Sequence, residues 1–361
     1  MKLLLTIISV TITLHIFAQA PTEPITILGG HTNDVDAVSI SNQGYIATGS
    51  FDQKINIYKA DSPFTYFKTL SGHMGPVNVV SFNSNGKLLA SGSEDRVIVL
   101  WDSLWQQSRR FEAHKDKINC LTFAPDGRYL YSGSDDKTII VWDLITGKQI
   151  NTIMHGQPVS AIAPTNDAKL VYVAGAEPKI KLYHMLSNKV IKTLDGHTDE
   201  VNDIAITSDG KYMVSGSNDK TARIWDLTTD KQLRILPVNC WKVTTVSISN
   251  DNNYVTTGCN DGSVKVWELK TGKLINSIDC IGSIARNVTF GKTNQYILGA
   301  FMLRNTADYG LRVFQSKISL TPFNVSLKNN TINADSNKKE TLKVPKVSIQ
   351  TTNKSPIPQK K

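Results

Sequence analysis

Catalytic signatures and metal-ligand clusters are both lacking in this chain of 361 residues. It contains no His-Glu-x-x-His zinc motif, no Gly-x-Ser-x-Gly nucleophile turn and no Gly-x-Gly-x-x-Gly preceding a helix, which argues against the common hydrolase and nucleotide-binding sites. The four cysteines lack metal-ligand spacing. We therefore expect no enzyme activity, no cofactor, no metal and no small-molecule substrate.

Long apolar runs are also scarce, and the most pronounced run lies at the N-terminus. Met1 and Lys2 precede an apolar stretch that reaches Ala18, with Gln19 directly after it. This pattern is typical of a secretory signal peptide, which we place at residues 1–18 with cleavage near Ala18. The stretch is short and polar for a membrane span, although an uncleaved anchor is the alternative. We expect a secreted, periplasmic or cell-surface protein.

Excess charge is confined to the C-terminal tail. The formal net charge is +9, yet residues 315–361 alone hold nine lysines against two acidic residues. That tail is rich in Lys, Asn, Ser, Thr and Pro, so we expect a disordered tail or linker. Two alternatives remain for it: a polybasic contact with an envelope or nucleic acid, and a linker to a catalytic domain of a larger protein. We expect no nucleic-acid binding elsewhere, and membrane contact only through this tail.

A repeat of about 42 residues dominates the remainder. An apolar residue opens each unit, at Val35, Val77, Ile118, Val159, Val201, Val243 and Ala285. Within a unit apolar residues alternate and turn residues separate the runs, which predicts four short antiparallel strands. Such a unit cannot bury its own apolar faces, so seven copies are expected to stack on one another.

One unit reads Gly72-His73, then Ser91-Gly92-Ser93, Asp95 and Trp101-Asp102. This motif, repeated at fixed spacing from Ile25 to Phe314, resembles that of the WD-repeat β-propeller family. The resemblance implies an all-β, seven-bladed propeller of four-stranded antiparallel blades over residues 19–314. It also implies that the segment 25–28 closes the ring by completing the last blade. Proteins of this family usually act as protein-interaction scaffolds, with partners landing on the loop face.

The resemblance further implies a buried hydrogen-bonded tetrad inside a blade. Three blades have a complete set: His73, Ser91, Asp95 and Trp101; His114, Ser132, Asp136 and Trp142; and His197, Ser215, Asp219 and Trp225. The first blade has a partial set, His31, Thr48, Asp52 and Tyr58. In such a chain every buried polar group finds a partner, so we interpret the histidines as structural rather than catalytic or metal-binding.

The other blades depart from this pattern. The fourth has His155, Val173, Glu177 and Tyr183; the sixth has Asn239, Thr257, Asp261 and Trp267; and the seventh has Arg304, Asp308 and Phe314. We expect these blades to depend more on apolar packing, and the seventh to be the least regular.

Partner contacts are predicted around the channel mouth on the loop face. The residue after the aligned apolar position supplies the ring; the candidates are Asp36, Asn78, Asn119, Asn202 and Arg286. Trp241, Lys242 and Phe51 lie on the same rim and, with Arg286, form the candidate hot spot. The alternative role for Trp241 is to plug the gap left by the missing histidine of the sixth blade.

The cysteines divide into two groups. Cys120 falls on an inward strand position and is most simply a core residue. Cys240, Cys259 and Cys280 all map near one rim of the sixth and seventh blades, so one pair is a candidate disulfide in an oxidising compartment. The sequence does not choose the pair.

Overall fold

A computed structural model describes residues 23–61, 63–280, 282–303 and 309–318. The signal-peptide segment 1–18, Arg304, Asp308 and the basic tail after Ile318 lie outside the described residues. Among the residues described, no helix is long and apolar enough to cross a membrane.

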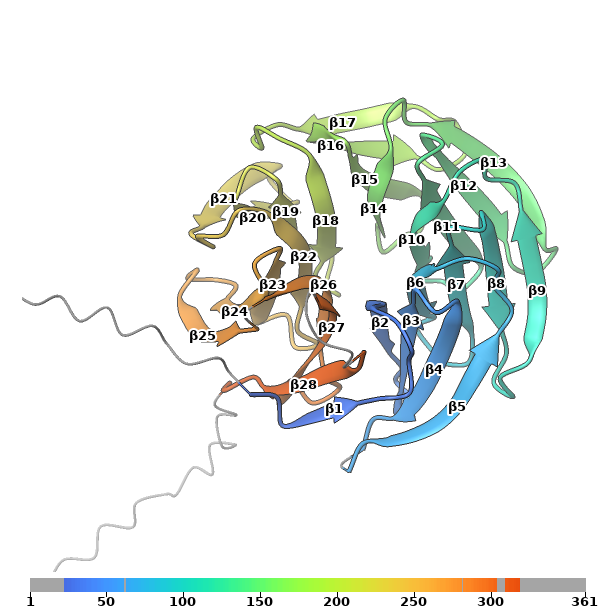
Figure 1. Cartoon of the computed structure of the whole chain (residues 1–361). Helices are drawn as coiled ribbons and strands as arrows, with labels where there is room; N and C mark the ends of the chain where they lie inside the picture. The colour runs from blue at the N-terminus through green and yellow to red at the C-terminus, as the bar shows by residue number, and fades with distance from the viewer. Residues whose placement is uncertain (1–22, 62, 281, 304–308, 319–361) are drawn as a thin grey trace, which may run out of the picture. The chain divides into compact units, whose positions relative to one another are not determined.

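In the described part of the chain, 28 strands form seven four-stranded antiparallel sheets around a central axis (Figure 1). The innermost strands are β2 (Val35–Ile40), β6 (Val77–Phe82), β10 (Ile118–Phe123), β14 (Val159–Pro164), β18 (Val201–Ile206), β22 (Val243–Ile248) and β26 (Ser283–Phe290). The second strands are β3 (Tyr45–Ser50), β7 (Leu89–Ser93), β11 (Tyr129–Ser134), β15 (Leu170–Gly175), β19 (Tyr212–Ser217), β23 (Tyr254–Cys259) and β27 (Tyr296–Leu303).

The third strands are β4 (Lys54–Lys59), β8 (Val97–Trp101), β12 (Thr138–Asp143), β16 (Glu177–His184), β20 (Ala222–Asp226), β24 (Ser263–Glu268) and β28 (Leu311–Gln315). The outer strands are β5 (Thr65–Ser71), β9 (Gln107–Glu112), β13 (Lys148–Met154), β17 (Val190–Leu194), β21 (Lys231–Leu236), β25 (Leu274–Asp279) and β1 (Thr26–Leu28). Each of blades 1 to 6 is made of four consecutive strands, and blade 7 combines β26, β27 and β28 with β1. This arrangement confirms the seven-bladed propeller.

Blade 7 is completed by the N-terminal strand. β1 pairs antiparallel with β28, with Thr26 opposite Val313 and Leu28 opposite Leu311. Figure 1 shows these two strands side by side although they come from opposite ends of the propeller sequence. The predicted closing strand is confirmed: β1 takes the outer position in blade 7 that the fourth strand occupies in each other blade, so β28 is paired on both sides.

The core lies between neighbouring blades. One apolar cluster, for example, joins Ile139 and Val141 of blade 3 to Val159 and Val173 of blade 4. The glycine of each Ser-Gly-Ser repeat makes this approach possible: a Cβ on Gly216 would stand 2.6 Å from a methyl group of Val243 in the next blade. A side chain there would force the blades apart, which explains the glycine in the repeat.

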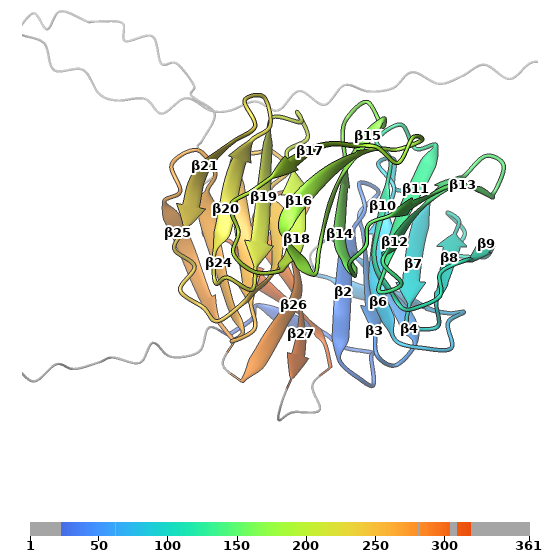
Figure 2. The same ribbon diagram turned by 90° about the horizontal axis from the view of Figure 1, so that it is seen from above.

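A β-bulge interrupts the innermost strand of every blade. The register shifts between the aligned apolar residue of each repeat and the second residue after it, as between Val201 and Asp203 or between Val243 and Thr245. The same shift occurs in the other five blades. A bulge adds one unpaired residue and redirects its side chain. The redirected residues are those that the sequence placed around the channel. Figure 2 shows the blades from the side, with their strands running between the two faces of the ring.

Candidate functional site

The tetrads of blades 2, 3 and 5 form continuous hydrogen-bond chains. In blade 3, His114 Nδ1 lies 2.8 Å from Asp136 Oδ2 and Nε2 lies 2.7 Å from Ser132 Oγ, while Trp142 Nε1 donates to the same hydroxyl at 3.0 Å. Corresponding contacts occur in the other two blades. Each hydroxyl therefore joins two buried ring groups, and each carboxylate holds an imidazole.

Burial and hydrogen bonding together set the charge of these groups. Burial lowers the pKa of His114 and of His197, although each neighbouring aspartate opposes the shift, so the imidazoles are neutral at pH 7. Burial alone would raise the pKa of Asp95, but hydrogen bonds from His73 and from the Met74 N–H outweigh it and lower that pKa to about 2. Across the described residues, no three His, Cys, Asp or Glu side chains gather as a metal site.

These shifts predict acid sensitivity in a defined range. The pKa of Asp95 and that of Asp52 are both lowered to about 2 from 3.8, so their contribution to stability is present above pH 4 and is lost as the pH falls towards 2. Urea unfolding measured between pH 2 and pH 5 should show this loss. In Asp95→Asn the free energy of unfolding should change less steeply with pH, by a slope that corresponds to at most about one bound proton. Identical slopes for the two proteins would contradict this assignment.

Blades 1 and 4 use different partners for their histidines. In blade 1, His31 contacts Asp52 at 2.9 Å and Thr48 at 2.7 Å, but the Tyr58 hydroxyl donates to the Gly29 carbonyl, next to the closing strand. The partial tetrad therefore contributes Tyr58 to ring closure.

In blade 4 the imidazole is turned around. His155 Nε2 lies 2.9 Å from Glu177 and its Nδ1 lies 3.1 Å from the Tyr183 hydroxyl, while Lys181 pairs with the same glutamate at 2.8 Å. Burial, with Lys181 nearby, lowers the pKa of His155 to about 4 despite Glu177. Blade 4 thus retains a polar brace built from different residues, and its greater dependence on apolar packing stays a prediction.

Blade 6 replaces the histidine brace with a disulfide. Asn239, at the histidine position, is exposed, and Cys240 next to it is bonded to Cys259 with a Cα–Cα distance of 6.3 Å. Cys259 occupies the position of Ser93, whose hydroxyl donates to the Gly75 carbonyl of the loop at 3.0 Å. The same hydrogen bond occurs in blades 3 and 5. A covalent bond thus stands where other blades have a hydrogen bond between strand and loop, and Cys280 is free.

The bulge residues line a central cavity of about 320 Å³ and bridge adjacent blades. Asn78, Asn119 and Asn202 each donate an amide hydrogen to the first carbonyl of the next blade, at 3.1, 3.0 and 2.7 Å. Thr244 makes the corresponding bond to Ala285. These donors are already engaged between blades, so partner binding through the three asparagines stays a prediction.

Blade 7 meets blade 1 through an ion pair. Arg286 Nε lies 3.1 Å from Asp36 Oδ1, and burial raises the pKa of Asp36 to about 6 although the guanidinium opposes that shift. Deeper in the channel, burial likewise raises the pKa of Asp203 to about 6, although that carboxylate accepts hydrogen bonds from Thr245 and Val246. Cys120 also lines this cavity, and burial raises the pKa of its thiol strongly. The sequence interpretation overlooked Asp203, although it lies at the first position after the bulge.

The rim residues differ widely in exposure. The Trp241 side chain is 79% exposed, so it does not plug blade 6. Lys242 and Phe51 are half-buried on the same face, and Arg286 is committed to Asp36. Met74, in the equivalent loop of blade 2, is 84% exposed and was missed because it follows the histidine at a position with no motif. The structure thus separates Trp241 from the rest of the candidate hot spot by its exposure.

Comparisons with known proteins agree with this geometry. Residues 22–59, 64–102, 105–143, 188–226 and 230–268, more than half of the chain, match the WD domain, G-beta repeat. The periodic tryptophan protein 2 homolog of Schizosaccharomyces pombe is 60% identical over 35 residues, or 10% of this chain and 4% of that protein. The WD repeat-containing protein WDS homolog of Arabidopsis thaliana is 40% identical over 88 residues, or 23% of this chain and 17% of that protein.

A guanine nucleotide-binding protein subunit beta of Arabidopsis thaliana is 36% identical over 75 residues, or 20% of each chain. The matched segments span no more than 20% of the length of these three relatives. The matches to the family model fall in blades 1, 2, 3, 5 and 6. In blade 4, which has no match, the tetrad is the most altered, and in blade 7, which also has none, it lies partly outside the described residues. Five repeat matches and seven four-stranded blades together show that the chain belongs to the WD-repeat family of β-propellers.

Proposed function

We propose that this protein is a non-catalytic scaffold, exported from the cytoplasm, that binds a protein partner on the channel-mouth face with Trp241 as the anchor. The exposure of Trp241, 79% on a face of short loops, carries the proposal. Interface energy concentrates in a few Trp, Tyr and Arg side chains that become buried in the complex. WD-repeat propellers generally bind protein partners, and they are generally not catalysts.

The loop that presents Trp241 is firmly held, which favours binding. Its neighbour Cys240 is 5% exposed and tied to Cys259 in the blade core, and Lys265 donates a hydrogen bond to the Val238 carbonyl at the start of the loop. A side chain that is already positioned loses less conformational entropy on binding. Trp241 is therefore better suited to be an anchor than an equally exposed residue on a loose loop.

Export is supported by two independent features. Residues 1–18 have the charged start and apolar stretch of a signal peptide. The disulfide between Cys240 and Cys259 belongs to an oxidising compartment, since cytosolic thiols are kept reduced. Expression with the native N-terminus, followed by mass spectrometry of the mature protein, tests both: a new N-terminus near residue 19 and a disulfide are expected.

Trp241→Ala tests the partner site. We expect it to weaken partner capture from the host's extracellular or envelope fraction at least about tenfold, because the anchor is lost. The melting temperature should not change, since the indole is largely exposed in the free protein. The control is Leu186→Ala, which removes a 59% exposed side chain from the opposite face. Equal capture by both variants would refute the anchor role, and a lowered melting temperature would reassign Trp241 to stability.

A further inference from the structure

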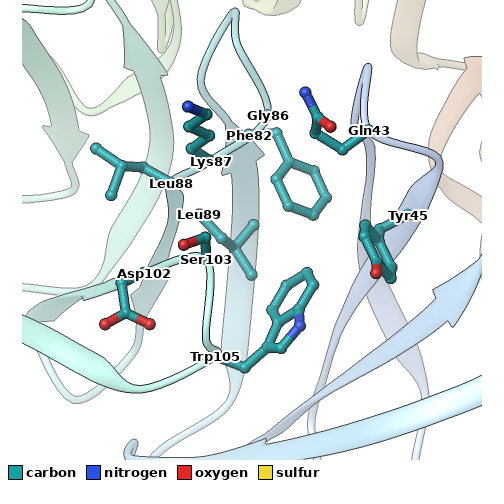
Figure 3. Close-up of a pocket in the computed structure, with 10 residues that line it drawn as sticks. All are labelled: Gln43, Tyr45, Phe82, Gly86, Lys87, Leu88, Leu89, Asp102, Ser103 and Trp105. Atoms are coloured by element: carbon teal, nitrogen blue, oxygen red, sulfur yellow. The ribbon is translucent and has the colours of Figure 1, made fainter. Parts of the chain in front are cut away.

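A cavity of about 290 Å³ lies between blades 1 and 2 on the face opposite the channel mouth (Figure 3). Tyr45, Phe82 and Trp105 surround it, with Leu89 at its floor. The lining comes from the turns that join the first to the second strand and the third to the fourth strand, and from the strand ends next to these turns. The cavity shares no residue with the channel. Its size suits one large side chain, being at the low end of the range for ligand pockets.

Trp105 is held in an unfavourable backbone conformation. Its φ is +62°, in a turn one residue shorter than those of blades 3 to 6, where the positive-φ residues before the fourth strand are Asn188 (+58°), Asp230 (+58°), Gly147 (+71°) and Gly272 (+71°). Glycine, asparagine and aspartate tolerate this region, whereas a bulky side chain there is an outlier that costs stability. The turn itself therefore does not favour tryptophan, and the contacts of the indole ring account for this residue.

The ring of Trp105 is the centre of an aromatic cluster. Its centroid lies 5.0 Å from that of Tyr45 and 6.3 Å from that of Phe82, both nearly edge-on, and 6.2 Å from that of Phe67. Phe67 remains 42% exposed and extends this apolar surface outward. Rings packed edge to face form the walls of a pocket, not a platform on which flat groups stack.

Related grooves in the ring have different chemistry. The groove between blades 4 and 5, about 330 Å³, is lined by Leu170, Ile206 and Leu227, with Asp167 and Asp209 at its edge. In the turn of blade 2, Ser103 takes the place that Leu227 has in blade 5, and Trp105 supplies the apolar contact instead. The groove between blades 7 and 1, about 210 Å³, is lined by two aromatic rings, Phe64 and Tyr296, and has no tryptophan. A wall of three aromatic rings that includes a tryptophan is thus particular to the groove between blades 1 and 2 among the described cavities.

The mouth of this groove is basic. Lys87 lines it, and Lys59 pairs with Tyr45 in the sheet, so both side chains face the same side. Lys68 pairs with Ile57, which belongs to the apolar cluster between blades 1 and 2. All three lysines are exposed, and none takes part in an ion pair found among the described residues. Asp102 is the acidic residue in the lining, and its Oδ1 accepts hydrogen bonds from Leu104 and Gln106 within the turn.

We propose that this groove is a second partner site, which binds an acidic peptide segment and takes one large apolar side chain of that segment between Tyr45, Phe82 and Trp105. The aromatic walls supply the apolar burial, and Lys87 in the lining, together with Lys59 and Lys68 on the adjoining strands, selects for acidic neighbours of the anchor. Single-stranded nucleic acid also combines lysines with aromatic rings, but it needs open ring faces for stacking, and these rings meet edge-on.

The test uses a fluorescein-labelled peptide with one leucine flanked on each side by three acidic residues. Fluorescence anisotropy should show binding to the full chain that is at least roughly tenfold tighter than for the same peptide with alanine in place of leucine. Trp105→Gly should remove this difference. Glycine fits the turn, as Gly147 and Gly272 show, so the variant is expected to fold; a melting curve checks this.

Three comparisons decide the outcome. Leu227→Ala, in the groove between blades 4 and 5, and Trp241→Ala, on the other face, should leave peptide binding unchanged. Lys59→Gln combined with Lys87→Gln should weaken binding and make it less sensitive to salt. Equal binding of the leucine and alanine peptides would overturn the proposal. Tighter binding of an oligothymidine that also depends on Trp105 would overturn it in favour of nucleic acid.

Discussion

Replacing Cys240 and Cys259 together is expected to lower the free energy of unfolding by about 3 kcal/mol. The bond closes a loop between residues 19 apart, and for loops of this size the restriction of the unfolded chain amounts to about 3 kcal/mol. Asn239 offers no compensating brace because it is exposed. Urea unfolding of the wild type and of Cys240→Thr/Cys259→Ala measures the loss, and a reducing agent should reproduce it in the wild type alone.

A matched pair of variants separates the covalent bond from the contact that it replaces. Cys240→Thr/Cys259→Ser copies the residues found in blade 5, Thr198 and Ser217, so the new hydroxyl can donate to the loop carbonyl. It should be more stable than the alanine version by about 1 kcal/mol, the usual net value of a hydrogen bond. Cys280→Ser is the control for a free cysteine. Unchanged stability in both double variants would show that blade 6 does not depend on the disulfide.

Ser132→Ala is expected to lower the free energy of unfolding by about 3 kcal/mol, although it removes only one oxygen atom. That hydroxyl contacts both His114 Nε2 and Trp142 Nε1, so its removal leaves two buried polar groups without partners. Each such group costs about 1 to 3 kcal/mol. Urea unfolding at pH 7 measures the change.

Blade 6 provides the matched control for this prediction. Thr257→Val keeps the side-chain volume and removes the hydroxyl that accepts from Trp267 Nε1 at 3.0 Å, but no histidine is present. This variant leaves one buried polar group without a partner instead of two, so the loss of unfolding free energy should be about half as large. If the two variants lose equal stability, the imidazole contributes nothing to the tetrad.

The sequence predicts the repeated features of this protein well, because each is specified seven times. Alternating apolar residues and the spacing of Val35, Val77 and their equivalents determine the strands and the number of blades, and the family resemblance supplies the closing role of β1. The tetrad contacts are implied by the family resemblance, and they agree with residue types that can satisfy one another when buried.

Features that the repeat pattern does not encode were harder to predict. The choice of Cys240 with Cys259, rather than Cys280, depends on a loop and a strand meeting in three dimensions. The bulge that turns Asn78, Asn119 and Asn202 towards the next blade is invisible in a pattern of apolar alternation, so their role between blades was not foreseen. Trp105 carried no motif, and only its positive φ and its ring contacts distinguish it.

The seam between β1 and β28 has a consequence for biosynthesis. Thr26 pairs with Val313, so this contact cannot form until nearly the whole propeller has left the ribosome. Until then β1 has no partner strand, and when β28 emerges its open edge can pair equally well with β1 of a neighbouring copy, which has the same sequence. Crowded synthesis should therefore favour domain-swapped dimers joined at this seam, and β1 supplied as a free peptide should suppress them.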